Sequence, residues 1–298
     1  DAVLPSDGYT ALGNFDNDDE AEIVLVGSGM ISVRNYDGSL LLGPLVLPNT
    51  WFGRGFGGAP TVGDFDGDGQ PEVGVAAKEY YVVYETDGSI KWKAKNRDYS
   101  SHRTGSSLFD FEGDGRIEVL YADEEFLRVY DGATGIVRFA VENASGTVLE
   151  YPVVADVDND GSADILVGGD MFRRLSSEST SWAPTRSIWN QYAYYIDNIN
   201  DDLTVPANPT KSWLTHNTFR LNTFPDRHAL DLADFRISDV RLIDKGDVVD
   251  LQATLLSRGR WAPQAELSVN FYNGDPAQGG LKVGSQTVSG LKLGDPLV

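Results

Sequence analysis

The stretch "GDFDGDGQPE", residues 63–72, places aspartates at positions 64, 66 and 68, with glycines between and after the last two. Carboxylates spaced this tightly repel one another unless a positive charge lies among them. A metal ion is the obvious candidate for that charge. The stretch therefore predicts a loop that binds a cation.

The same motif occurs four times in the chain. The copies are "NFDNDDEAE" (14–22), "DFDGDGQPE" (64–72), "DFEGDGRIE" (110–118) and "DVDNDGSAD" (156–164), and they start 50, 46 and 46 residues apart. Each copy is followed at once by an apolar run typical of a strand, such as "IVLVG" or "VGVAA". Asp-Gly pairs at 37, 87 and 131 lie between β-rich stretches, which is a strong hairpin signal. One unit of about 46 residues then holds four strands, as a β-propeller blade does.

The acidic charge of the chain is concentrated in these windows. The chain has 45 acidic and 24 basic residues, a net charge of -21. The four windows hold 17 acids and one base, Arg116, so the rest of the chain carries only -5. A generally acidic surface would spread its carboxylates evenly, whereas ligands for an ion would be clustered. The distribution favours metal sites over solvated turns.

Composition also excludes several classes of protein. The acidity disfavours binding to a nucleic-acid backbone. There is no run of about 18 apolar residues, so no direct membrane span is expected. Cysteine is absent, which excludes disulfides and thiol catalysis.

The residue types of the windows indicate calcium. Oxygen ligands on flexible loops of several carboxylates suit a hard cation, and calcium better than magnesium. An EF-hand would need a glutamate at position twelve, where these windows have Leu25, Val75, Tyr121 and Val167. We expect the ligands at positions one, three, five and nine instead, with three to four calcium ions bound. They are Asn14, Asp16, Asp18 and Glu22 in the first copy, Asp64, Asp66, Asp68 and Glu72 in the second, Asp110, Glu112, Asp114 and Glu118 in the third, and Asp156, Asp158, Asp160 and Asp164 in the fourth. The first copy, with Asn14 at position one and Asp19 in place of the expected glycine, is the weakest site.

Residues 10–170 resemble the FG-GAP repeat, the blade motif of integrin α-subunit propellers and of many bacterial secreted proteins. The sequence "FGGAP" at 56–60, directly before "TVGDFDGDGQPE", and the four copies in register carry this resemblance. In that family the Asp-rich loop joins two strands of a blade and binds calcium. The resemblance implies the same role for the candidate ligands, and an extracellular or cell-surface location.

Three segments follow from these patterns: blades over 1–180, an aromatic segment over 181–230 that packs on or closes the propeller, and a sandwich over 231–298. Residues 181–222 resemble a stretch that follows such repeats in bacterial surface and secreted proteins. Apolar residues at helical spacing over 188–199, after Pro184, predict a short amphipathic helix. Its aromatic side chains either pack in the core or form a platform for sugar rings. Asn198, Asn200 and Asp202 mimic positions one, three and five of the loop and are a weaker, fifth candidate site.

The C-terminal part changes to alternating strands divided by turns such as "DKGD" (244–247) and "NGDP" (273–276), which predicts an antiparallel sandwich. The stretches "NFYNGDPAQGG" (270–280) and "VSGLKLGD" (288–295) resemble the CARDB type of immunoglobulin-like adhesion domain. Such a fold needs about 100 residues, and 231–298 supplies 68. We therefore expect the sandwich to be incomplete.

Two classes of function remain open. The first is a non-enzymatic, calcium-stabilised binding, adhesion or scaffold protein of the cell surface. The second is a propeller that acts on carbohydrate, as a lectin or a polysaccharide lyase or hydrolase. The chain offers the lone histidines His102, His216 and His228 but no G-x-S-x-G, H-E-x-x-H or Walker motif, so we expect no enzyme.

The expected partners are a cell-surface protein or glycan, or other portions of the same precursor. Propellers close with roughly four to eight blades, so four copies are the minimum. An open propeller would leave strand edges unpaired, and such edges invite another chain to add a strand. Self-association through these edges is therefore also expected.

Overall fold

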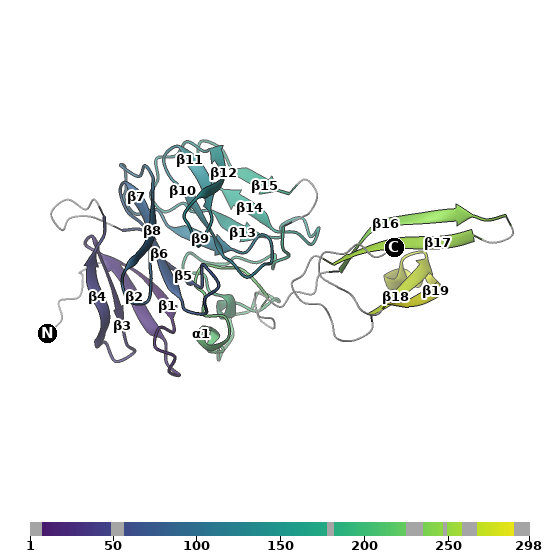
Figure 1. Cartoon of the computed structure of the whole chain (residues 1–298), viewed down its shortest axis with the longest axis horizontal. Coiled ribbons are helices and arrows are strands. Elements are labelled where there is room, and N and C mark those ends of the chain that lie inside the picture. The colour runs from purple at the N-terminus through teal and green to yellow at the C-terminus, as the bar shows by residue number, and fades with distance from the viewer. Residues whose placement is uncertain are drawn as a thin grey trace. The chain divides into compact units, whose positions relative to one another are not determined.

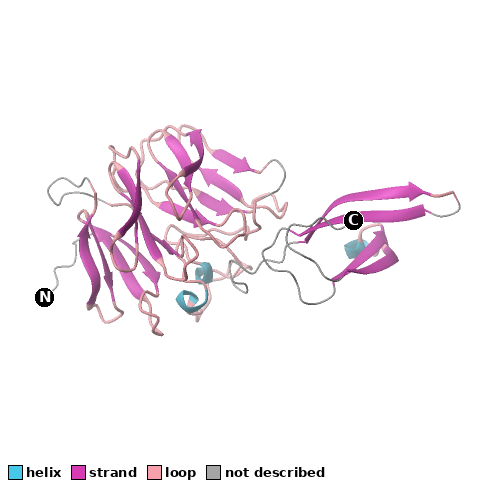
Figure 2. Cartoon of the chain, viewed as in Figure 1, coloured by secondary structure: helices cyan, strands magenta, loops and turns pink. Residues whose placement is uncertain are grey.

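The computed structural model describes residues 8–48, 57–177, 182–224, 235–246, 249–257 and 267–288. These residues form strands joined by loops, with three short helical turns, so the all-β prediction is confirmed (Figure 2). The chain divides into two compact units, Asp1–Ala229 and Leu230–Val298. His228 and residues 289–295 of the CARDB-like stretch lie outside the described residues.

Four small antiparallel sheets make up the first unit (Figure 1). The first holds β1 (Tyr9–Gly13), β2 (Glu22–Gly27), β3 (Met30–Arg34) and β4 (Leu40–Val46). The second holds β5 (Thr61–Gly63), β6 (Glu72–Ala76), β7 (Tyr80–Tyr84) and β8 (Ile90–Lys95). The third holds β9 (Ser106–Phe109), β10 (Glu118–Ala122), β11 (Phe126–Tyr130) and β12 (Val137–Glu142). The fourth holds β13 (Val153–Ala155), β14 (Asp164–Val167) and β15 (Arg173–Ser176).

Strands follow one another in sequence order within each sheet, and every acidic window is the loop between the first and second strands. The second strands β6 and β10 are buried throughout, whereas the last strands expose side chains such as Ile90 and Phe139. The turns at Asp37-Gly38 and Asp87-Gly88 join third strands to fourth strands, and both glycines have a positive φ. Glycine adopts this backbone conformation without steric cost.

The sheets pack side by side through their first strands. Strand β1 lies against β5, β5 against β9, and β9 against β13. Apolar side chains fill the space between neighbours, with Val62 and Val75 in one cluster, Tyr81 and Tyr121 in the next, and Ile165 in the third. None of the described sheets closes on itself as a barrel, and the arrangement is a row of separate sheets around shared cores.

A segment from the end of the first unit, residues 217–222, crosses all four first strands, and we call it the strap. It bonds to each sheet at or next to its first strand. The contacts are Asn217 with Asn14 (2.7 Å, Oδ1 accepting from the backbone N–H), Phe219 with Val62, Leu221 with Leu108, and Asn222 with the carbonyl of Val154 (2.9 Å). The strap therefore ties together four sheets whose first strands are spread along the chain from Tyr9 to Ala155.

The prediction of a helix over residues 188–199 is wrong, because this stretch holds only the 3-10 turn η1 (Ile196–Asn198). Several backbone carbonyls of the stretch accept hydrogen bonds from buried side chains instead of from N–H groups of a helical turn. The Arg186 guanidinium donates to the carbonyls of Ile196 (3.0 Å) and Ile199 (2.8 Å). Tyr194 and Ile196 are fully buried, so the aromatic segment packs into the unit. The short helix α1 (Ser212–Thr215) follows.

The second unit consists of two hairpins among the described residues. Strands β16 (Phe235–Asp244) and β17 (Val249–Ser257) form one, and β18 (Leu267–Asn273) and β19 (Leu281–Val288) form the other, with η2 (Pro276–Gln278) in its turn. No described strand joins the two hairpins into one sheet. The immunoglobulin-like sandwich stays a prediction.

Candidate metal centres

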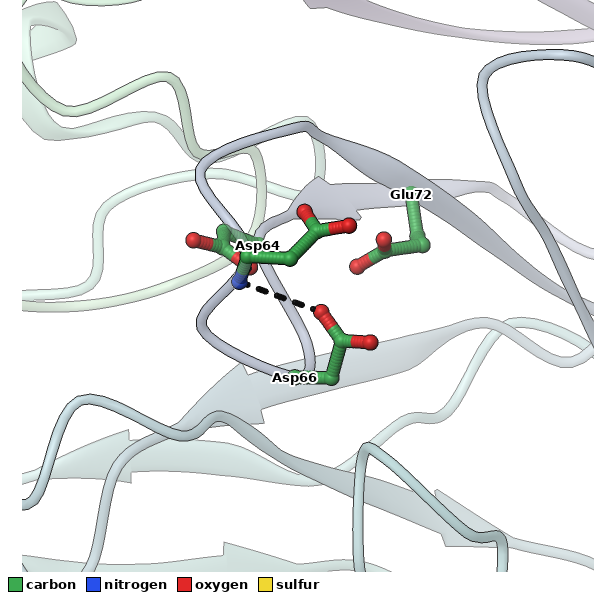
Figure 3. A group of neighbouring side chains, drawn as sticks. Asp64, Asp66 and Glu72 are labelled. Atoms are coloured by element: carbon green, nitrogen blue, oxygen red, sulfur yellow. Dashed lines mark hydrogen bonds between the residues drawn. The ribbon is translucent and has the colours of Figure 1, made fainter.

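Each acidic window folds as a tight loop held by the side chain at its first position, which is an aspartate in three windows and Asn14 in the first. In the second window, Asp64 accepts the backbone N–H of Gly67 at 2.7 Å and of Gly69 at 2.9 Å. Both glycines have a positive φ, 80° and 89°, which lets the chain curl back on itself. Figure 3 shows the result: the carboxylates of Asp64, Asp66 and Glu72 face a common space inside the loop.

Four groups of carboxylates result, one in each sheet, and within each group the candidate ligand oxygens lie within 4.8 Å of one another. We number them clusters 1 to 4. Cluster 1 is Asp16, Asp18 and Glu22; cluster 2 is Asp64, Asp66, Asp68 and Glu72; cluster 3 is Asp110, Glu112 and Glu118; cluster 4 is Asp156, Asp158 and Asp164.

The acid at position nine opens the second strand of each sheet and is the most buried member of its cluster. These four side chains are no more than 2 % exposed. One oxygen of each accepts the backbone N–H of the residue at position two of the same window. The pairs are Glu22 with Phe15 (2.7 Å), Glu72 with Phe65 (2.6 Å), Glu118 with Phe111 (3.1 Å) and Asp164 with Val157 (3.1 Å). This bond closes the loop over the strand end.

Burial disfavours the charged form of the three glutamates at position nine and of Asp110. It raises the pKa of Glu72 to about 8, and that of Glu118 to about 8 with a further contribution from neighbouring Glu112. Burial also raises the pKa of Asp110 to about 6 and that of Glu22 above its ordinary value. A divalent ion among the carboxylates would reverse these shifts, because it favours the charged form.

Two buried oxygens in the clusters accept no hydrogen bond, namely Oε1 of Glu72 and Oδ1 of Asp156. Their residues are 0 % and 7 % exposed. A buried acceptor without a donor costs about 1–3 kcal/mol. A hard cation with oxygen ligands would satisfy both atoms, so the donor sets fit the calcium predicted from the sequence.

The structure also places basic side chains in three clusters, which the sequence analysis missed. The Lys91 ammonium bonds to Asp66 and lies 3.7 Å from Oε1 of Glu72. The Arg138 guanidinium lies 3.0 Å from Glu112 and 3.4 Å from Glu118. In cluster 4, Arg174 bonds to Asp158 and lies 2.9 Å from Asp164. The only sequence signal for the first two was their place shortly after an Asp-Gly turn.

Three of the sixteen predicted ligands lie outside the four clusters. The amide oxygen of Asn14 accepts the N–H of Asn17 at 2.7 Å. Asn14 therefore stabilises the turn of its loop, as the aspartate at position one does in the other three windows. Asp114 and Asp160 each accept the N–H of the residue two positions on, at 2.9 and 2.8 Å. Their role as ligands stays a prediction, as does that of the clustered acids.

The fifth candidate site and the histidines form local bonds. Asp202 accepts the N–H of Thr204 at 3.0 Å, and the Asn200 amide donates to the hydroxyl of the same threonine. His102 lies 3.1 Å from the carbonyl of Tyr99, and His216 lies 2.9 Å from the hydroxyl of Thr215. None of these residues belongs to a described acidic cluster.

Comparisons with known proteins agree with the repeats. A family model described as FG-GAP-like repeat matches residues 110–167, which include the third and fourth windows. The crystal structure of the V. cholerae biofilm matrix protein Bap1 is similar, with a TM-score of 0.59 at 19% identity over 73% of this chain. The chain spans 64% of the length of that structure. The similarity is one of fold.

Weaker matches are BamB from Moraxella catarrhalis and Raptor from Chaetomium thermophilum. The first has a TM-score of 0.35 at 12% identity and covers 62% of this chain and 54% of its own. The second has a TM-score of 0.34 at 12% identity and covers 60% of this chain and 18% of its own. The search of curated proteins found no match. No helix among the described residues is long and apolar enough to cross a membrane.

Proposed function

We propose that this chain is a non-enzymatic, calcium-stabilised module of an extracellular scaffold or adhesion protein, built as a β-propeller of FG-GAP-type blades. One observation carries the proposal: four sheets present an acidic cluster at the same loop, between the first and second strands. A single such cluster is common on protein surfaces, whereas four equivalent ones in successive sheets indicate a shared ligand.

The propeller assignment is supported by how the sheets are placed. First strands lie next to one another in order, as the inner strands of propeller blades do. The strap bonds to the first strands of sheets two, three and four, and in this proposal it helps to hold the blades together. The match to the FG-GAP-like repeat model and the similarity of fold to a biofilm matrix protein support an extracellular role.

Calcium is favoured over other ions by the ligands and by the loops. All cluster members are carboxylates, and the chain has no cysteine. Calcium accepts six to eight oxygens in flexible geometry, whereas magnesium requires near-ideal octahedral geometry. Carboxylates on curled loops, with one fixed acid on a strand, suit the more tolerant ion. The partner on the outer surface is a protein or glycan of the cell surface, or another portion of the same precursor.

We expect a calcium titration of the purified chain, followed by native mass spectrometry, to count three to four ions. Asp66→Ala removes a ligand of cluster 2 and should lower that count by one. The matched control is Asp87→Ala in the Asp-Gly turn of the same sheet, which is exposed and outside the clusters. A count that is zero in the wild type, or that Asp66→Ala leaves unchanged, contradicts the assignment.

We also expect the chain to release no reducing ends or unsaturated products from pectic, uronic and neutral polysaccharides. The acids with raised pKa belong to the clusters, where an ion would occupy them, so they cannot serve as general acids. A polysaccharide lyase of known activity serves as the positive control. Product above the blank that His102→Ala abolishes would replace the scaffold proposal with the carbohydrate-active alternative.

A further inference from the structure

The first three sheets share a β-bulge at the start of the fourth strand. At this bulge one residue has no partner in the third strand. It is Leu41 between the pairs made by Leu40 and Leu42, Lys91 between those of Ile90 and Trp92, and Arg138 between those of Val137 and Phe139. A bulge of this kind re-aims the side chain of its extra residue. These three residues therefore occupy equivalent places in the fold.

In sheets two and three the bulge carries a basic side chain into the acidic cluster. Lys91 is bonded to Asp66 and is 2.8 Å from Glu85, and its side chain is 10 % exposed. Arg138 bonds to Glu112 of cluster 3 and to Asp131, the latter at 2.7 Å. Each cation thus lies among carboxylates that are candidate ligands for the metal.

Cluster 4 has a basic side chain from a different place. Arg174 lies on β15, the third strand of its sheet, and contacts Asp158 and Asp164. Two different strand positions therefore supply a cation to the same kind of loop. This recurrence indicates a role in the clusters and not an accident of the repeat.

Cluster 1 is the exception. Its bulge residue is Leu41, which is 41% exposed. Among the described residues no basic side chain forms an ion pair with Asp16, Asp18 or Glu22. The Lys211 ammonium lies 3.3 Å from Glu20 in the same window. Among the described residues, cluster 1 thus has a cation beside its loop but none paired with its three clustered carboxylates.

A basic side chain alone does not satisfy all the carboxylate oxygens of clusters 2 and 4. Oε1 of Glu72 is buried and accepts no hydrogen bond, although Lys91 lies in the same cluster. Oδ1 of Asp156 is also buried and accepts no hydrogen bond, although Arg174 lies in that cluster. A single positive charge also cannot neutralise four carboxylates. Clusters 2 and 4 therefore keep uncompensated negative charge that a metal cation could balance, in addition to the basic side chain that they already hold.

We propose that the side chain at the bulge sets the calcium affinity of clusters 1, 2 and 3. Lys91 and Arg138 act as internal counter-ions in the metal-free protein, and a divalent ion must displace them or share the carboxylates with them. Leu41 leaves cluster 1 free of this competition, which offsets its missing aspartate at position one. The inference rests on the proposed function, in that the clusters bind calcium.

The test is a site-resolved calcium titration of the full chain by NMR, with the amide signals of Phe15, Gly69 and Gly115 as reporters for clusters 1, 2 and 3. Lys91→Met should raise the affinity of cluster 2 by about tenfold or more, because removing a nearby positive charge removes repulsion of the ion. Cluster 3 should stay unchanged. Leu41→Lys should weaken cluster 1 by a similar factor.

The metal-free protein gives a second readout. In chelator, Lys91→Met should melt below the wild type and Leu41→Lys above it, since each change removes or adds a counter-ion. Lys93→Met, on the same strand with its ammonium over the Tyr80 ring, is the matched control for a general change of charge.

Three results overturn the inference: equal or weaker calcium binding by Lys91→Met, the same gain from Lys93→Met, or an unaffected cluster 1 in Leu41→Lys. Calcium binding that persists in these cases leaves the proposed function standing. A wild type that binds no calcium at any reporter overturns both.

Discussion

Chelation of calcium should lower the melting temperature of this chain by about 20 °C or more. Extracellular calcium modules bind with dissociation constants of roughly 0.1–1 mM. At about a hundredfold excess of calcium over that constant, each ion adds about 2.7 kcal/mol to the free energy of unfolding. Three to four ions then contribute about 8–11 kcal/mol, which rivals the whole stability of a domain, about 5–15 kcal/mol. For a unit of this size, each kcal/mol of stability changes the melting temperature by about 2–4 °C, so the loss of all the ions should lower it by about 20 °C or more.

The measurement is a thermal melt followed by circular dichroism in about 10 mM calcium, in excess EGTA, and in EGTA with calcium restored. Magnesium at the same concentration is the control, because its stricter geometry should stabilise the chain far less. Coincident melting curves with and without chelator would show that the acidic clusters do not stabilise the fold through an ion.

The repeated sheets and the acidic loops could be predicted because their causes are local. Alternating aspartate and glycine define a tight loop, and the apolar run after it defines a strand, so both follow from about ten neighbouring residues. The convergence of Asp64, Asp66 and Glu72 in one loop has the same local origin. Their occupancy by calcium is a property of the ion as well as of the chain, and it stays a prediction.

The basic side chains in the clusters could not be predicted in this way. Lys91 follows Asp66 by 25 residues, and it reaches the cluster only because of strand pairing and the bulge. Periodicity in one sequence does not reveal a bulge. A comparison of the Asp-Gly turns at 37 and 87 would have shown that position four after the aspartate is leucine at 41 and lysine at 91, but not where that side chain points.

Neither the strap nor the absence of a helix over 188–199 could be predicted, because both depend on contacts between residues far apart in the sequence. Helical spacing over 188–199 predicts a helix only if the backbone carbonyls bond within the segment. In this structure buried side chains donate hydrogen bonds to these carbonyls instead. One of them, Asn222, bonds to the carbonyl of Ile188, more than 30 residues earlier in the chain. Contacts between residues this far apart, such as Asn217 with Asn14, leave no periodic signal in the sequence.

Replacement of Asn222 should be the most destabilising single change in the strap. Its side chain is fully buried, and its amide nitrogen lies within hydrogen-bond distance of the carbonyls of Val154 (2.9 Å), Arg186 (3.0 Å) and Ile188 (3.1 Å). Its amide oxygen accepts the hydroxyl of Tyr194 at 2.7 Å. Asn222→Ala leaves several of these buried groups without partners, and each such group costs about 1–3 kcal/mol.

We therefore expect Asn222→Ala to lower the free energy of unfolding by about 3 kcal/mol in urea titrations with calcium present. Asn222→Asp keeps the shape but sets a carboxylate against three carbonyl oxygens, so it should cost more. The control is Asn200→Ala, which removes only an exposed bond to Thr204. Because the carbonyl of Arg186 also accepts the N–H of Asp156, the loss should extend to calcium binding at cluster 4. If Asn222→Ala unfolds at the same urea concentration as Asn200→Ala, the strap does not hold the four sheets together, and their order must come from the cores between them alone.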